Sequence, residues 1–180
     1  MAPRPILTVA EMSRADRAAV TAGTPVLALM QRAGRAVARA IEARFARQPV
    51  RVLCGPGDNG GDGYVAAVEL AAHGWPVVVE ALAPPATEAS KAARALWKGP
   101  VSGWGEGGGE TLVVDALFGA GLNRPLDPAV LRRLDVLSAP PCQMIAVDVP
   151  SGLSGDTGRP VGTGAASAVL TVTFQARKTA

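Results

Sequence analysis

The chain is poor in cysteine and histidine, which excludes several kinds of site. Its 180 residues include two cysteines, Cys54 and Cys142, and one histidine, His73. These three residues cannot build a zinc site of the cysteine and histidine type or a framework of disulfides. Because structural disulfides belong to oxidising compartments, the low cysteine content indicates a reducing compartment, and we expect a cytoplasmic protein.

Aromatic residues, basic clusters and long apolar runs are also lacking. Aromatic residues make up 4% of the chain, and the net charge of +3 comes from scattered arginines rather than from a basic block. We therefore expect no nucleic acid as a partner. No stretch approaches the roughly 18 uninterrupted apolar residues of a membrane-spanning helix, and the N-terminus lacks the apolar core of a signal peptide. We expect no membrane partner.

The residues that are present fit one globular domain. Apolar residues make up 48% and charged residues 18% of the chain, enough to bury a core at this length. The 21 glycines and 15 prolines follow no fixed period, which favours many tight connections over a fibrous or disordered chain. There is no internal repeat, and we expect the glycine-rich residues 99–110 to form a surface loop. Residues 1–180 are predicted to be a single domain.

Two helices are predicted near the N-terminus. Thr8 and Glu11 form a capping box, which predicts a helix over residues 9–20. Thr24 is predicted as the N-cap of a second helix, with Pro25 at its first position. Apolar residues then recur at helical spacing over residues 26–41, which indicates packing against a core or a dimer partner. Gly34 on that stripe permits close approach of another backbone.

Beyond residue 49, apolar strands alternate with helices. Strands are predicted at residues 50–54, 75–82, 111–115, 144–149 and 168–174, and helices at residues 64–74, 87–97 and 127–137, with residues 55–63 as a loop. Strands that are apolar throughout and alternate with helices predict an α/β fold of three layers (αβα) around a mostly parallel sheet. In such sheets, ligands bind beyond the carboxyl ends of the strands.

The loop after the first of these strands carries a glycine motif. Residues 55–60 match the pattern G-x-G-x-x-G, and Glu80 follows about twenty residues later, as in dinucleotide-binding folds. The motif alone favours a nucleotide or phosphate site and would suit a dehydrogenase. Asp58 and Asp62, however, place carboxylates where a pyrophosphate prefers bare amide groups and the helix dipole. Asp62 is equally well explained as a charge at the helix N-terminus or as a ligand contact.

Two further strands end in aspartate, at Asp115 and Asp148. Either residue alone could cap a helix, but together they indicate a site at the sheet edge. If Asp62, Asp115 and Asp148 converge, their repulsion must be offset by a cation or by a bound proton. Lys178, one of only three lysines, and a metal ion are the candidates for that cation.

The nature of the site follows from its residue types. Oxygen donors from Asn59, Asp115 and Ser151 suit a hard ion. Ser151 lacks the nucleophile elbow of a hydrolase, and His73 is predicted to cap a helix C-terminus.

Four segments, GPGDNGGDGYVAA, VVDALFGAGLNRPL, AVDVPSGLSGDTG and TVTF with the later lysine, occur in this order after LTVAEMSRADRAA and LMQRAGRA. In order and spacing they resemble the NAD(P)H-hydrate epimerase family, the YjeF N-terminal domain, over nearly the whole chain. The resemblance implies a Rossmann-like fold, a homodimer and a potassium ion. It also implies interconversion of the R and S forms of hydrated NADH and NADPH (NADHX and NADPHX), as part of nicotinamide cofactor repair.

Carried over by motif, the resemblance implies roles for individual residues. The substrate-binding residues would be Asp58, Asn59, Gly60, Gly61, Asp62, Gly119, Ala120, Gly121, Leu122, Asn123, Arg124, Pro125 and Asp148. Asn59, Asp115 and Ser151 would ligate potassium. We expect Asp148 to move the proton and Lys178 to hold Asp148 ionised or to orient it. Asp58 stands where the family usually has asparagine and adds a negative charge there.

Other interpretations stay open at this point. The family domain usually continues beyond the position of Lys178, and in many bacteria it is fused to an NAD(P)H-hydrate dehydratase. The resemblance therefore also allows a chain shortened at its C-terminus, the N-terminal part of a bifunctional epimerase and dehydratase, or a separate dehydratase as partner. A non-catalytic nucleotide-binding or scaffold module, a dehydrogenase and a sugar-nucleotide binder are the rival functions.

Overall fold

The computed structural model describes residues 6–174 and 176–178, with the backbone alone at Arg177 and Lys178. Helices and strands alternate along most of this length. In chain order the elements are β1 (Ile6–Leu7), α1 (Val9–Thr21), α2 (Val26–Glu42), β2 (Val50–Cys54), α3 (Asp58–Ala72), β3 (Val77–Ala81), α4 (Glu88–Leu96), β4 (Val101–Gly103), β5 (Leu112–Ala116), α5 (Pro128–Ser138), β6 (Gln143–Val147), β7 (Leu170–Val172) and β8 (Arg177–Lys178).

The central sheet is parallel and reverses its strand order in the middle. Its six strands lie in the order β4-β3-β2-β5-β6-β7, and each neighbouring pair is parallel. From β2 the chain proceeds outward through β3 and β4, and from β5 it proceeds outward the other way. The carboxyl ends of β2 and β5 therefore form the switch point at which such sheets leave a crevice for a ligand.

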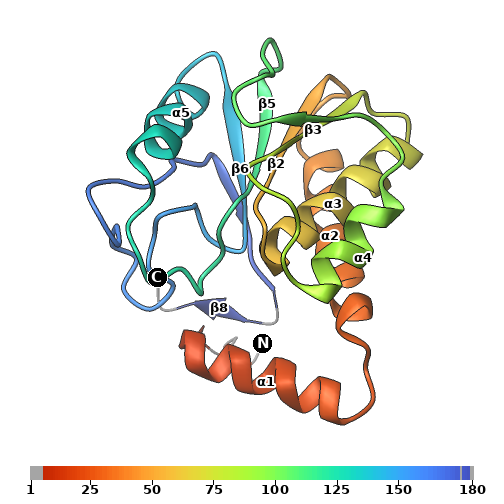
Figure 1. Ribbon diagram of the computed structural model, residues 1–180, viewed down its shortest axis with the longest axis vertical. Helices are drawn as coiled ribbons and strands as arrows, with labels where there is room; N and C mark the ends of the chain where they lie inside the picture. Colours follow the sequence, from red (N-terminus) through yellow and green to blue (C-terminus); the bar gives the residue numbers. More distant parts are fainter. Residues whose placement is uncertain (1–5, 175, 179–180) are drawn as a thin grey trace.

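Helices cover both faces of this sheet (Figure 1), with α2, α3 and α4 on one face and α5 on the other. Successive strand residues alternate between two cores: Val52 and Val114 face the three helices, whereas Leu53 and Val113 face α5. Gly34 allows α2 to approach α3 closely, because a Cβ there would lie 2.5 Å from Cβ of Val65. The predicted three-layer α/β fold is confirmed.

Helix α1 lies apart from the three layers, at the bottom of Figure 1. It begins after Thr8, whose side chain and that of Glu11 form the predicted capping box. Strand β1 before it pairs in parallel with β8, so that Leu7 is opposite Lys178. The amide of Val9 donates to Oδ1 of Asp156 at 2.7 Å, and Gly23, with φ of 95°, turns the chain toward α2.

Three local predictions are wrong. The N-cap of α2 is Pro25 rather than Thr24, and no side chain caps this helix. Residues 55–63 are not all loop, because α3 already begins at Asp58 and winds through the glycines. Residues 99–110, predicted to be a surface loop, contain the short edge strand β4. His73 is the C-cap of α3, as predicted. None of the helices in the described part of the chain is long and apolar enough to cross a membrane.

Candidate functional site

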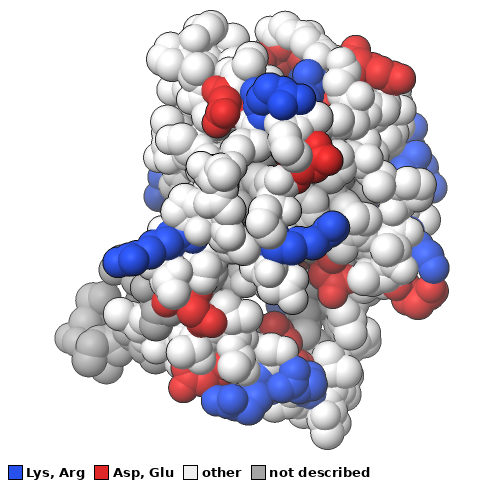
Figure 2. Space-filling view, turned by 60° about the vertical axis from the view of Figure 1, so that its left-hand side comes forward, with Lys and Arg blue, Asp and Glu red and all other residues white. Residues whose placement is uncertain are grey.

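A cavity of about 1270 Å³ opens at the carboxyl edge of the sheet. Its walls come from the start of α3, from the segment after β5, from Asp148 after β6 and from one side each of α1 and α2. In the space-filling view (Figure 2), the surface is recessed between α1 at the bottom and the body of the molecule, and acidic atoms lie inside the recess. On this face, basic and acidic residues are interspersed, without one extended patch of a single sign.

Most of the residues expected to bind substrate border this cavity. The lining residues among them are Asp58, Asn59, Asp62, Gly119, Ala120, Gly121, Leu122, Asn123, Arg124 and Asp148. Gly60, Gly61 and Pro125 do not line it. The two glycines are buried in packing contacts, since a Cβ would collide with the Gly55 carbonyl at Gly60 and with the Met30 sulfur at Gly61.

Asp148 is held in an unusual conformation by its neighbours. Its φ of 72° is the only positive φ at a non-glycine position among the described residues. Aspartate adopts this left-handed region at lower cost than most side chains, and such outliers cluster at functional sites. Its Oδ2 accepts a hydrogen bond of 2.8 Å from the amide of Ala120, and its own amide donates to Val172 at 2.8 Å. The carboxylate is therefore fixed at the cavity wall.

Asp115 and Ser151 form a buried pair beneath the cavity rather than in its lining. Oδ1 of Asp115 accepts from the Ser151 hydroxyl at 2.6 Å, and Oδ2 accepts from the Ser151 amide at 2.8 Å. Burial raises the pKa of Asp115 although these hydrogen bonds lower it. No described lysine or arginine forms a salt bridge with Asp115. A buried carboxylate of this kind is costly without a counter-charge.

Oxygen atoms of Ser151 and Asn59 lie around Phe118 and Gly119. The Phe118 amide donates to Oγ of Ser151 at 3.0 Å, and a Cβ at Gly119 would lie 3.1 Å from Oδ1 of Asn59. Carboxylate, hydroxyl, amide and carbonyl oxygens therefore meet at one segment, next to the buried charge of Asp115. In addition, Nδ2 of Asn59 is buried without a hydrogen-bond partner in the described structure, so a ligand oxygen can accept from it.

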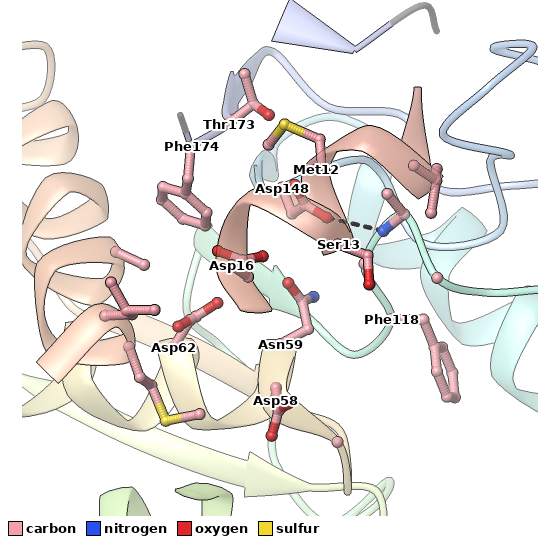
Figure 3. Close-up of a pocket in the computed structure, with 18 of the residues that line it drawn as sticks. Met12, Ser13, Asp16, Asp58, Asn59, Asp62, Phe118, Asp148, Thr173 and Phe174 are labelled. Atoms are coloured by element: carbon pink, nitrogen blue, oxygen red, sulfur yellow. Dashed lines mark hydrogen bonds between the residues drawn. The ribbon is translucent and has the colours of Figure 1, made fainter. Parts of the chain in front are cut away.

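Asp62 faces the same cavity from the first turns of α3. Burial raises its pKa well above the usual range, and the negative charges of Asp148, Asp58 and Asp16 raise it further. In the close-up (Figure 3), the side chains of Asp16 and Asp62 point toward one another, with Asn59 and Asp148 beside them. Asp62 therefore holds a proton to higher pH than an exposed aspartate does.

Two predicted features are not part of this geometry. The side chain of Lys178 lies outside the described residues, so the predicted contact of Lys178 with Asp148 stays a prediction. Glu80, the acidic residue of the dinucleotide motif, is completely buried away from the cavity and forms salt bridges with Arg51 at 2.6 Å and Arg133 at 2.7 Å. Since Glu80 is used in this ion cluster, the dehydrogenase interpretation loses its ribose partner.

The sequence reasoning missed the wall formed by α1. Met12, Ser13, Asp16 and Arg17 all line the cavity. A signal was available, because these residues lie on one side of the predicted helix at spacings of three and four. What the spacing cannot reveal is whether that side packs on a core or borders a cavity.

Comparison with known proteins agrees with the fold. The family model described as YjeF-related protein N-terminus matches residues 26–180. The chain is 39% identical, over 96% of its length, to a bifunctional NAD(P)H-hydrate repair enzyme Nnr of Pyrobaculum aerophilum. It is 44% identical, over 76% of its length, to an NAD(P)H-hydrate epimerase of Bordetella pertussis. It spans 37% of the first relative and 62% of the second.

A solved structure has the same architecture. The crystal structure of the yeast protein ynu0 superposes with a TM-score of 0.87 at 25% sequence identity. The superposition covers 97% of this chain and 82% of the yeast chain.

Proposed function

Because this chain belongs to the family of the YjeF-related protein N-terminus, we propose that it is an epimerase of hydrated nicotinamide dinucleotides. It would interconvert the R and S forms of NADHX and NADPHX in the repair of nicotinamide cofactors. A relative that is 44% identical is named an NAD(P)H-hydrate epimerase, and one that is 39% identical is named a bifunctional NAD(P)H-hydrate repair enzyme. The observation that carries the proposal is the fixed carboxylate of Asp148, which faces the same cavity as Asp62 and the segment 119–124.

The chemistry requires a proton at the leaving oxygen. In the hydrated ring, a carbon next to the ring nitrogen bears a hydroxyl group. When the carbon–oxygen bond breaks, the oxygen takes up a proton and leaves as water, and the ring becomes an iminium-like cation. Water then adds to the opposite face and gives up a proton, which inverts the carbon. A positioned carboxyl group accelerates such proton transfers by roughly 10²- to 10⁴-fold.

Asp148 and Asp62 can serve the two faces of the ring. They lie on different elements, one after β6 and the other in α3, and both border the cavity. Asp148 is our candidate for the group that moves the proton, because the Ala120 amide fixes its carboxylate. The raised pKa of Asp62 suits it to give a proton to a leaving hydroxyl on the other face. Lys178 remains our candidate to orient Asp148.

A potassium ion is proposed at Asn59, Asp115 and Ser151. The fit rests on the oxygen donors and on the buried Asp115 carboxylate, which has no described cationic salt-bridge partner. When bound, the ion would supply positive charge that binds substrate oxygens. The chain's own residues, Asp115 and Ser151, hold the segment 117–119 in place through hydrogen bonds to the amides of Leu117 and Phe118.

A coupled assay tests the epimerase proposal. The pure R hydrate is incubated with a dehydratase that is specific for the S hydrate, with and without this protein. Faster consumption of the R hydrate in its presence is the expected result, and NADHX and NADPHX are compared in parallel. Binding of the hydrates without faster consumption would contradict an epimerase and favour the non-catalytic module.

Assembly and location are also proposals. We propose a homodimer in the cytoplasm, working beside a separate or fused NAD(P)H-hydrate dehydratase. The bifunctional name of the Pyrobaculum relative supports the link to such an enzyme. Light scattering of the purified protein tests the dimer, for which a mass near twice 18.3 kDa is expected.

A further inference from the structure

One side of α1 borders the cavity along most of its length. The lining residues of this helix are Val9, Met12, Ser13, Asp16, Arg17, Val20 and Thr21, which follow helical spacing along a single face. A face with this spacing normally packs against a core. In α1, however, only Met12 is buried, and Val20 remains 40% exposed. An occupant of the cavity would therefore cover this face.

Asp16 lies in the middle of that face, about one helical turn from Met12 and from Val20. A helix that only had to cover a core would carry an apolar residue there. The Asp16 side chain instead points into the cavity, toward Asp62 (Figure 3). The family model matches from residue 26 onward, so α1 and Asp16 lie outside the matched range.

Three carboxyl groups from three elements thus border one part of the cavity. Asp16 comes from α1, Asp62 from α3 and Asp148 from the segment after β6. They are close enough that the charges of Asp148 and Asp16 both raise the pKa of Asp62. The negative charges of Asp16 and Asp148 disfavour ionisation of Asp62, and for the same reason they favour a positive charge on a ligand in this part of the cavity.

The proposed reaction places a positive charge on the substrate. Loss of the hydroxyl leaves the nicotinamide ring cationic until water adds, while both hydrates have a neutral ring. Building on the proposed function, we propose that Asp16 is a further substrate-contacting residue, whose carboxylate stabilises the cationic ring. A group that interacts with the cation more strongly than with the neutral ring raises kcat rather than lowering KM.

The test compares Asp16→Asn with the wild-type protein in the coupled assay. Removing the charge is expected to lower kcat by about 10- to 100-fold, because preorganised charge at a developing ion is a large contribution to catalysis. KM should stay within about threefold, since the neutral substrates gain little from the carboxylate. Asp16→Glu keeps the charge and should recover most of the activity. Asp135→Asn removes a carboxylate from the exposed side of α5 and should behave like wild type.

A binding measurement provides a readout that does not depend on turnover. NADP⁺ has a cationic ring and NADPH a neutral one, so a change in the ratio of their dissociation constants between wild type and variant reports on the ring charge. Asp16→Asn should weaken NADP⁺ binding by about five- to tenfold and leave NADPH binding within about twofold. Circular dichroism and thermal unfolding of each variant establish that it is folded.

The outcomes separate this proposal from the proposed function. If wild type epimerises and Asp16→Asn keeps its kcat, Asp16 does not stabilise the cation. If Asp16→Asn weakens the binding of NADP⁺ and of NADPH equally, Asp16 lines the cavity without stabilising the cationic ring. If wild type epimerises neither hydrate, the proposed function fails, and the ratio of the two dissociation constants still decides the role of Asp16.

Discussion

At Asp148 the backbone takes a conformation that few side chains tolerate, and the side chain accepts a hydrogen bond from the amide of Ala120. A carboxylate or an amide oxygen can accept the 2.8 Å hydrogen bond from Ala120, and both aspartate and asparagine enter the left-handed region readily. The geometry therefore separates the structural requirement at this position from the chemical one. Asparagine satisfies the first and cannot exchange a proton.

Asp148→Asn is accordingly expected to keep the fold and to lose epimerisation. The loss in kcat should be about 10²- to 10⁴-fold, the usual contribution of a positioned acid or base. The coupled assay measures it, and the melting temperature should remain close to that of wild type. Asp148→Ala should in addition lower the melting temperature, because alanine loses the hydrogen bond and disfavours the backbone angle. Normal turnover in the asparagine variant would exclude Asp148 as the proton carrier.

Asp62 predicts a dependence of stability on pH. Its pKa is raised in the folded protein by burial and by the charges of Asp148, Asp58 and Asp16. An aspartate in the unfolded chain has a pKa of about 3.9. Below that pH both states are protonated, so Asp62→Asn should not differ from wild type on this account. As pH rises further, ionisation favours the unfolded state, and wild type loses stability relative to the variant.

The expected result is thus a higher free energy of unfolding for Asp62→Asn at pH 7, with a gain that shrinks toward pH 4. Urea unfolding at a series of pH values measures it, and Asp135→Asn serves as the control. A difference that does not change with pH would contradict a raised pKa at Asp62. A gain in stability together with a loss of epimerisation would show that the site costs the fold stability.

Among the elements, the contact between α2 and α3 depends on Gly34. A Cβ at this position would lie 2.5 Å from Cβ of Val65 and 2.7 Å from the carbonyl oxygen of Asp62. Helix propensity alone would favour alanine by about 1 kcal/mol. The collision involves backbone and a buried side chain, neither of which can move away easily. We therefore expect the steric cost of the Cβ to exceed the gain in helix propensity.

Gly34→Ala should therefore destabilise the protein by about 1–3 kcal/mol, as overpacking does. Thermal or urea unfolding measures the change. Gly108→Ala is the control, because a Cβ there meets no atom within 4 Å and its φ is not positive. Any separation of α2 from α3 that relieves part of the collision would also displace Asp62 and Asn59, so activity should fall more than stability alone explains. An unchanged midpoint would mean that the two helices separate at little cost.

The elements also show where prediction from sequence succeeds. The capping box at Thr8 and the apolar strands after residue 49 are local signals, and the helices and strands they predict are present. The start of α3 was missed because glycine has a low helix propensity, whereas packing against Gly55 and Met30 requires glycine at these helical positions. Strands β1 and β8 are two residues long, too short to give a pattern.

In the whole molecule, the sheet order decides which residues meet. Strand-end aspartates were recognised from the sequence, but only the pairing of β2 with β5 and of β5 with β6 places Asn59, Asp115 and Asp148 at one edge. The sequence could not separate Asp148 at the cavity from Asp115 beneath it, because both end apolar strands. Nor could it assign Glu80, since a motif of glycines does not reveal the buried Arg51 and the partly buried Arg133 that form salt bridges with its carboxylate.

The pairing of β1 with β8 joins the first and last described strands in a ladder of two rungs. Helix α1, which carries Asp16, follows β1 directly and is therefore held in place by the pairing of β1 with β8. The six-stranded sheet does not include either strand. Loss of the pairing between β1 and β8 would then free the cavity wall formed by α1 and abolish turnover, while the calorimetric transition of the six-stranded sheet and its helices barely changed. Catalysis would then depend on this pairing more strongly than folding does.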